Sequence, residues 1–209
     1  MTGHVVTVAQ QKGGSGKTTL AVNLACAALA DGKSVAVLDT DPQGSLGRWF
    51  MTRRDTLGEP GLDFATASAW GVSYECEKLR KAHDVVFVDT PPKIDADLRP
   101  ALRESDLVIV PVAASHLDLW ATEAVLELAG RENKTSLLVL NRATKRAKLT
   151  DVLSGEMAQI DAPMANTVIG NRVIYAEALG QGQSAVEMRK SSPAAKEIKA
   201  LWAEVQAHL

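Results

Sequence analysis

The chain has 209 residues and a mass of 22.3 kDa, which suits one domain that buries roughly 70% of its unfolded surface. Hydrophobic residues at 46% and charged residues at 23% exclude a disordered or fibrous chain, and a net charge of −2 provides no whole-chain attraction for nucleic acid. Cys26 and Cys76 lie far apart without CxxC spacing, which excludes a disulfide scaffold or a zinc knuckle. No apolar stretch reaches the roughly 18 residues of a membrane span. We therefore expect a soluble protein of the reducing cytoplasm, with one domain over residues 1–209.

Short apolar runs of strand length alternate with longer stretches of helical periodicity, and a mostly parallel sheet requires this alternation. The expected strands are 4–10, 34–39, 62–66, 85–89, 107–112, 137–141 and 166–169. The expected helices are 16–31, 46–51, 74–82, 117–129 and 193–209. The fold class is therefore α/β, with a mostly parallel twisted sheet that carries helices on both faces.

A glycine-rich segment, KGGSGKTT over residues 12–19, stands between the first expected strand and the first expected helix. This setting predicts a phosphate loop, because glycines let backbone N–H groups turn toward phosphate oxygens and the helix N-terminus adds partial positive charge. We expect Lys17 to bridge the terminal phosphates and Thr18 to bind Mg²⁺. The expected nucleotide-binding residues of the loop are Gly13, Gly14, Ser15, Gly16, Lys17, Thr18 and Thr19. The segment departs from the usual pattern, because Gln11 replaces the first glycine and Lys12 precedes the glycines.

Acidic residues stand at the ends of two expected strands, where parallel sheets bind their ligands. Asp39 and Asp41 belong to LDTDPQG over residues 38–44, and their alternate spacing lets both face one site. One of them could instead cap the helix that begins near Gly44. Asp89 ends the apolar run DVVFVD, which has the Walker B form and predicts an Mg²⁺ contact through water.

The lysine ahead of the glycines, the LDTDPQG segment and the run that ends at Asp89 together resemble the ParA/MinD family of ATPases with a deviant Walker A loop. The resemblance covers nearly the whole chain and implies a P-loop fold, with ATP and Mg²⁺ as cofactors. It implies that Lys12 reaches the nucleotide of the partner subunit, that Asp41 orients the attacking water, and that Asp39 supports the metal shell. Lys12, Lys17 and Asp41 are thus the expected catalytic residues, and Thr18, Asp39 and Asp89 the expected metal site.

Asn141, at the end of a strand, resembles the adenine-contacting asparagine of the family, although an Asx turn is an alternative. The resemblance further implies slow ATP hydrolysis, a homodimer in the ATP-bound state and a partner protein that stimulates turnover. Family members use the dimer to bind a surface, either DNA or a membrane.

The basic residues favour DNA over a membrane as that surface. Arg142, Lys145, Arg146 and Lys148 form an acid-free run that could follow phosphates, although a solvated helix start is the alternative. Arg172 lies close to where DNA-binding members of the family have an arginine, and the pair at 189–190 could add a contact. The expected DNA-binding residues are Arg142, Lys145, Arg146 and Arg172. The tail helix mixes lysines and glutamates on its polar face, which favours a helix docked on its own core over a membrane anchor.

The expected function is a ParA-type ATPase that forms an ATP-dependent dimer on nonspecific DNA, associated with the nucleoid and with no membrane contact. Hydrolysis would segregate or position a plasmid, a chromosome region or a protein cluster. One alternative is a MinD- or MipZ-like regulator of the division site. A small-molecule kinase or ligase is a second alternative, which Lys12 and the LDTDPQG segment disfavour. Core packing is expected for at least three of the four tryptophans at positions 49, 70, 120 and 202.

Overall fold

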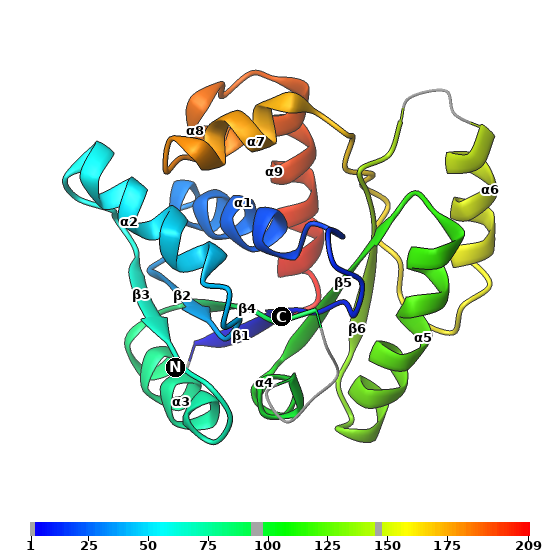
Figure 1. The fold of residues 1–209 in the computed structure, drawn as a ribbon, viewed down its shortest axis with the longest axis horizontal. Helices are drawn as coiled ribbons and strands as arrows, with labels where there is room; N and C mark the ends of the chain where they lie inside the picture. The colour runs from blue at the N-terminus through cyan, green and yellow to red at the C-terminus, as the bar shows by residue number, and fades with distance from the viewer. Residues whose placement is uncertain (1–2, 93–97, 145–147) are drawn as a thin grey trace.

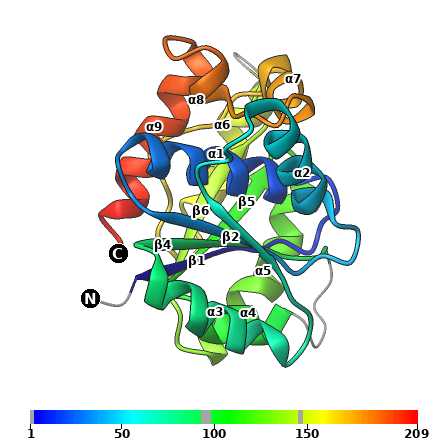
Figure 2. The same ribbon diagram turned by 90° about the vertical axis from the view of Figure 1, so that its left-hand side faces the viewer.

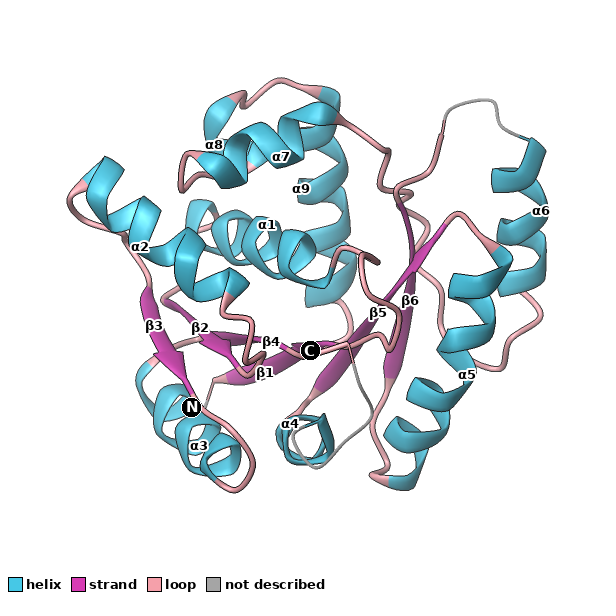
Figure 3. Cartoon of the chain, viewed as in Figure 1, coloured by secondary structure: helices cyan, strands magenta, loops and turns pink. Residues whose placement is uncertain are grey.

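A computed structural model describes residues 3–92, 98–144 and 148–209 and shows a six-stranded parallel sheet in the order β3-β2-β4-β1-β5-β6 (Figure 1). The strands are β1 His4–Val8, β2 Val35–Asp39, β3 Asp63–Thr66, β4 Val85–Asp89, β5 Leu107–Ala113 and β6 Ser136–Asn141. The helices are α1 Lys17–Ala30, α2 Ser45–Leu57, α3 Gly71–Ala82, α4 Leu98–Glu104, α5 His116–Arg131, α6 Lys148–Met157, α7 Val173–Gly180, α8 Ala185–Met188 and α9 Pro193–Gln206. Figure 3 distinguishes these elements by colour.

Helices cover both faces of the sheet, which explains why the central strands β1, β2 and β4 are buried at every position except His4 and are mostly apolar. On one face, Val6, Val37 and Phe87 pack in a core with residues of α1, α2, α7, α8 and α9. On the other face, their neighbours Val5 and Leu38 pack with α3, while strands β5 and β6 pack with α4, α5 and α6. Figure 2 shows the two layers on either side of the strands. The expected α/β architecture is therefore confirmed.

The expected strand at 166–169 is wrong. Among the described residues, isolated bridges occur only on either side of this segment, between Leu138 and Met164 and between Ala143 and Gly170, while Ile169 N–H donates to Leu140 O at 2.9 Å. The backbone N–H groups of residues 166 and 167 instead donate to the carboxylate of Glu204, at 2.6 and 2.9 Å. A side chain of α9 thus takes the donors that a strand would offer to its neighbour. Helix α2 is longer than expected: it accommodates Gly47 in its first turn and continues to Leu57, where Gly58 with a φ of 73° ends it.

The tail forms α9, and its apolar face is buried against the core next to α1. Ile198, Leu201 and Val205 are fully buried, and the Trp202 ring lies 6.0 Å from that of Phe87. The expectation of a docked tail helix therefore agrees with the structure. In the part of the chain that is described, no helix has the length and apolarity to cross a bilayer.

The expectation that at least three tryptophans pack in the core is wrong. Trp49 and Trp202 are buried, but Trp70 is 88% exposed and Trp120 is 64% exposed. Trp70 precedes α3 in a turn, and Trp120 lies on the outward side of α5, next to the buried Leu119. A single apolar residue in a helix does not reveal which way it faces.

Candidate nucleotide-binding site

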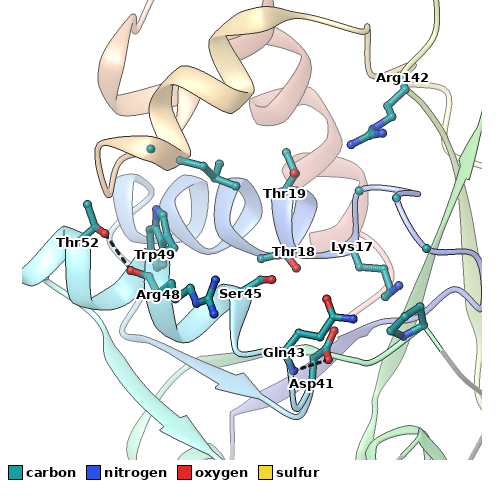
Figure 4. Close-up of a pocket in the computed structure, with 16 residues that line it drawn as sticks. Lys17, Thr18, Thr19, Asp41, Gln43, Ser45, Arg48, Trp49, Thr52 and Arg142 are labelled. Atoms are coloured by element: carbon teal, nitrogen blue, oxygen red, sulfur yellow. Dashed lines mark hydrogen bonds between the residues drawn. The ribbon is translucent and has the colours of Figure 1, made fainter.

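A cavity of about 550 Å³ opens where β1, β2 and β4 end, over the first turn of α1 (Figure 4). The phosphate loop forms one wall, and α2 with the end of α7 forms the other. The residues that line it are Gly13, Gly14, Gly16, Lys17, Thr18, Thr19, Asp41, Gln43, Ser45, Arg48, Trp49, Thr52, Pro92, Arg142, Leu179 and Gly180. The carboxyl edge of the sheet thus holds the site, as the strand-end motifs predict.

The phosphate loop adopts the backbone that its glycines allow. Gly14 has a φ of 80° and Gly16 a φ of 94°, which other residues rarely adopt. A Cβ on Gly16 would lie 2.5 Å from the amide nitrogen of Asn141, so that no side chain fits there. The buried Ser15 hydroxyl has no hydrogen-bond partner in the described part of the chain. Lys12 is exposed and does not line the cavity, which leaves its side chain free to reach outside its own site.

The start of α1 brings Lys17 and Thr18 to the end of β4. Lys17 is only 7% exposed, and burial lowers its pKa although Asp89 and Asp41 oppose the shift. The Thr18 hydroxyl donates to Asp89 Oδ2 at 2.5 Å. Burial raises the pKa of Asp89 to about 7, and its other oxygen, Oδ1, is buried with no partner among the residues that the structure describes. A buried carboxylate oxygen with nothing to bind, next to a threonine hydroxyl, fits a site for Mg²⁺ or its water.

The two acids after β2 have different surroundings. Asp39 is 2% exposed and accepts from Asp41 N–H at 3.0 Å and from Gly47 N–H at 2.9 Å, so both of its oxygens hold the loop and the start of α2. Asp41 lines the cavity and accepts from Gln43 N–H at 2.9 Å. Capping, the alternative for one of the pair, therefore describes Asp39 in this structure. The Asp39 metal role stays a prediction, as does the water-orienting role of Asp41.

A metal at this site would depend on ligands from outside the protein. Within residues 3–92, 98–144 and 148–209, no three His, Cys, Asp or Glu side chains gather into a group that could hold a metal. Mg²⁺ characteristically keeps several waters and binds through one or two protein groups plus substrate phosphates. Thr18 and Asp89 match that pattern, because they supply two oxygen ligands beside the phosphate loop.

Asn141 lies against the phosphate loop. Its side-chain nitrogen donates to Ser15 O at 2.8 Å, and its side-chain oxygen accepts from Arg142 N–H at 2.9 Å. A second cavity of about 240 Å³ adjoins it, lined by Gly16, Thr19, Asn141, Arg142, Gly170, Asn171, Arg172, Tyr175 and Ala176. This cavity is continuous with the first, because the two share Gly16, Thr19 and Arg142 in their lining. The adenine contact of Asn141 stays a prediction, beside its role in holding the loop.

The structure does not gather the expected DNA-binding arginines on an open surface. Arg142 has a φ of 53° and its guanidinium lies within 4.0 Å of the position of a Cβ on Gly14, over the phosphate loop. Arg172 forms an ion pair with Glu197, with Nε to Oε2 at 3.0 Å. Lys145 and Arg146 lie outside the described residues. DNA binding by these four residues stays a prediction, and in this structure Arg142 lines the nucleotide cavity and Arg172 is paired with Glu197.

The sequence analysis missed the wall opposite the phosphate loop. Arg48, Trp49 and Thr52 come from α2, while Leu179 and Gly180 end α7. Arg48 and Trp49 follow the LDTDPQG segment by a few residues, which is the only signal that could have found them. No sequence signal marks the two residues of α7, because they reach the site through packing between distant parts of the chain.

The strand, glycine-rich turn and helix, with the Thr18–Asp89 hydrogen bond beneath them, define a P-loop nucleotide-binding protein. The chain belongs to the family described as the CobQ/CobB/MinD/ParA nucleotide binding domain, which matches residues 6–186. The ParA/MinD resemblance is thereby confirmed.

Similar proteins agree with this family. The chain is 31% identical to the maintenance of carboxysome distribution protein A of Halothiobacillus neapolitanus, over 95% of this chain and 94% of the relative. It is 29% identical to the chromosome-partitioning ATPase Soj of Thermus thermophilus, over 98% and 96% of the two chains. The septum site-determining protein MinD of Pyrococcus horikoshii, solved with Mg-ADP, has the same fold, with a TM-score of 0.81 at 19% identity over 97% of this chain and 95% of that one.

Proposed function

We propose that this chain is an Mg²⁺-dependent ATPase that forms an ATP-bound homodimer and positions or segregates a cargo on nonspecific DNA. The observation that carries the ATPase is the Thr18–Asp89 pair beneath the phosphate loop, with Asp89 Oδ1 buried and unpartnered. The relatives named for carboxysome distribution and chromosome partitioning support a positioning function. The site of action would be the nucleoid in the cytoplasm, and a partner protein would stimulate slow basal turnover.

The reaction is attack of water on the terminal phosphate of ATP, which yields ADP and phosphate. Lys17 and the N–H groups at the start of α1 offset the charge that develops on the phosphate oxygens. Asp41 lines the cavity and is the carboxylate available to orient the water. Thr18 and Asp89 would hold Mg²⁺, which when bound neutralises charge on the β- and γ-phosphates.

The exposure of Lys12 supports a role in assembly. This lysine is exposed and lies outside the set that lines its own cavity, so its charge is available to a nucleotide in a second copy of the chain. ATP would then bridge two subunits through contacts that ADP offers less completely. The proposal of an ATP-dependent dimer rests on this geometry together with the family.

Asp41→Ala tests the order of these steps, with Asp55→Ala near the far end of α2 as the matched control. We expect Asp41→Ala to bind ATP and elute as a dimer in size exclusion while phosphate release falls to background. Asp55→Ala should behave as wild type, because Asp55 is exposed and does not line the cavity. A monomeric Asp41→Ala protein with bound ATP would assign Asp41 to assembly and contradict its catalytic role.

The DNA part of the proposal rests on basic groups away from the cavities. Arg189 and Lys190 are exposed and have no ion pair with any described residue, and Lys145 and Arg146 are further basic residues expected to contact DNA. Two copies in a dimer double the number of phosphates neutralised, so that affinity should fall steeply with salt. A MinD-like membrane function is the second candidate, but the buried apolar face of α9 weakens it, because that face is used in the core.

The test is a gel-shift series with the Asp41→Ala dimer from low to physiological salt. Reversal of Lys145 with Arg146 to glutamate should weaken binding to every DNA sequence alike. The same reversal at Lys196 with Lys199, both exposed on α9, is the control and should weaken binding much less. If both pairs of reversals weakened DNA binding equally, the effect would come from net charge and not from a specific contact. Recruitment of the ATP dimer to anionic liposomes with no DNA binding would favour the membrane function.

A further inference from the structure

The arginines in the described residues fall into two groups by their ion pairs. Those with a carboxylate partner are Arg53, Arg54, Arg80, Arg99, Arg103, Arg131 and Arg172. In the described part of the chain Arg48, Arg142 and Arg189 have none. Two of these three, Arg48 and Arg142, line the nucleotide cavity, whereas Arg189 lies outside it. Unpaired guanidinium groups are thus concentrated at the site where an anionic ligand would bind.

The two cavity arginines stand on opposite sides of the start of α1. Figure 4 shows Arg48 beside Ser45 on α2 and Arg142 above the phosphate loop, with Lys17, Thr18 and Thr19 between them. Arg142 is fixed there by its backbone, because Asn141 accepts its N–H and its φ of 53° turns the chain toward the loop. Its Nε lies 3.7 Å from the position that a Cβ on Gly16 would take.

The charge of the cavity depends on these two residues. The charged residues in its lining are Lys17, Asp41, Arg48 and Arg142. Lys17 and Asp41 cancel one another, so the two arginines give the lining its net positive charge. A nucleoside polyphosphate remains anionic even with Mg²⁺, and planar guanidinium groups bind phosphate oxygens through paired N–H donors.

We propose that Arg48 and Arg142 contact the phosphates of the bound nucleotide and clamp the polyphosphate from the two sides of α1. This inference rests on the proposed nucleotide site and adds two phosphate-binding residues to it. Arg48 comes from the helix that follows Asp41, so a nucleotide held by Arg48 also fixes the segment that carries the water-orienting carboxylate. Arg142 thereby acts at the nucleotide and not primarily at DNA.

The test compares Arg48→Met and Arg142→Met with Arg189→Met, an unpaired and exposed arginine outside the cavity that serves as the matched control. A fluorescent ATP analogue with Mg²⁺ gives the affinity for ATP. Inorganic tripolyphosphate, used as a competitor, reports phosphate contacts without a base. We expect each cavity variant to weaken both ligands by about tenfold and the double variant by about a hundredfold, while Arg189→Met stays within about twofold of wild type. Arg48→Lys should retain part of the affinity because it keeps the charge.

Two outcomes would overturn the inference. Unchanged tripolyphosphate affinity in a cavity variant would show that its arginine does not touch the phosphates, whether or not ATP binding falls. Equal losses in Arg189→Met would reduce the effect to net charge. An affinity loss supports the inference when the thermal unfolding midpoint of the variant equals that of wild type, because the variant is then still folded. Lys17→Ala separates this inference from the proposed nucleotide site. If Lys17→Ala abolishes ATP binding and the arginine variants do not weaken it, only the arginine clamp is contradicted. If Lys17→Ala binds ATP as wild type does, the proposed nucleotide site itself is contradicted.

Discussion

The two walls of the nucleotide cavity are built in different ways. The phosphate-loop wall comes from one continuous segment, and each of its special backbone angles falls on a glycine. The opposite wall joins α2 to the segment of α7 and α8, more than a hundred residues later. There the Arg53 guanidinium donates to Glu187 at 2.7 and 3.0 Å and to Gly182 O at 3.1 Å, while Trp49 Nε1 donates to Gln183 O at 3.1 Å.

The two walls therefore have different functions: one binds the nucleotide and the other stabilises the fold around it. The loop wall carries most of the groups that meet phosphate, so changes there should alter nucleotide binding with little effect on folding. In the opposite wall Arg48 is exposed toward the cavity, but Arg53 and Trp49 hold the wall together through an ion pair and an indole hydrogen bond, so changes at these two contacts should cost stability first. The comparison predicts two classes of variant that different measurements distinguish.

The largest effect is expected at Lys17. Lys17→Ala removes the buried cation of the loop wall and should weaken Mg-ATP binding at least a thousandfold, which is about 4 kcal/mol. The free energy of unfolding should change little or rise, because burial already disfavours the charged lysine. Calorimetric titration with Mg-ATP and urea unfolding of the same protein measure both. Lys33→Ala, an exposed lysine just past the other end of α1, is the control and should leave both unchanged. A large loss of stability in Lys17→Ala would erase the distinction between the walls.

Most of the fold could be predicted because its signals are local. Apolar runs such as Val85–Asp89 are buried on both faces of a parallel sheet, and their composition alone shows it. The segment 166–169 ends in two strand-forming residues, Val168 and Ile169, but the backbone N–H groups of residues 166 and 167 donate to Glu204, a residue of α9. No local sequence pattern indicates that a side chain of α9 competes for these donors. The prediction that Trp120 is buried is wrong for a related reason, because the direction of an isolated tryptophan depends on the orientation of the helix.

The site divides in the same way. Lys17, Thr18 and Asp89 could be predicted because strand, loop and helix fix their relative positions, and the structure joins Thr18 to Asp89. The surroundings of Arg142 and Arg172 could not be predicted, because they include the phosphate loop and Glu197, which lie far away in the sequence. Charge runs in a sequence reveal how many cations there are and not which of them are already paired.

The second largest effect is expected at Glu187. Glu187→Ala leaves the Arg53 guanidinium, whose side chain is 3% exposed, without its counter-ion and removes the capping box of α8. We expect a loss of about 3 kcal/mol in the free energy of unfolding at pH 7, measured by urea denaturation. Nucleotide affinity should fall far less than in Lys17→Ala.

The same variant predicts a pH dependence. Burial alone would raise the pKa of Glu187, but the hydrogen bonds and charge of Arg53 outweigh it and lower the pKa below its ordinary 4.5. A carboxylate with a lowered pKa stabilises the folded state above its unfolded pKa and loses that contribution as pH falls through its folded value. The stability gap between wild type and Glu187→Ala should therefore be constant from pH 7 to about 5 and narrow in more acidic solution. A gap that widened in acid would contradict the ion pair as its source.

Arg53→Met should have a smaller effect than Glu187→Ala. Methionine fills much of the space of the arginine stem, and the carboxylate left behind is 27% exposed and can reach water. The cost includes the lost donors to Pro60 O and Gly182 O, and we expect about 2 kcal/mol from urea unfolding. Arg131→Met is the matched control, because its pair with Glu127 is 66% exposed on both sides, and it should cost less than about 0.5 kcal/mol. An Arg53→Met protein less stable than Glu187→Ala would reverse the order that the burial of the two partners predicts.

The smallest effect is expected at Trp49, where the two classes of variant meet. Trp49→Phe keeps an aromatic ring in the wall but leaves Gln183 O without its indole donor, which should cost about 1 kcal/mol in the free energy of unfolding. Trp120→Phe is the matched control, because Trp120 is 64% exposed with no hydrogen bond from its indole to a described residue, and its cost should stay within about 0.5 kcal/mol. Because Trp49 lines the cavity and Trp120 does not, Mg-ATP should change the tryptophan fluorescence of wild type and Trp120→Phe. That change should be lost in Trp49→Phe even where calorimetry shows that ATP still binds. A fluorescence change that survives in Trp49→Phe and disappears in Trp120→Phe would mean that the nucleotide acts on α5 and not on the α2 wall.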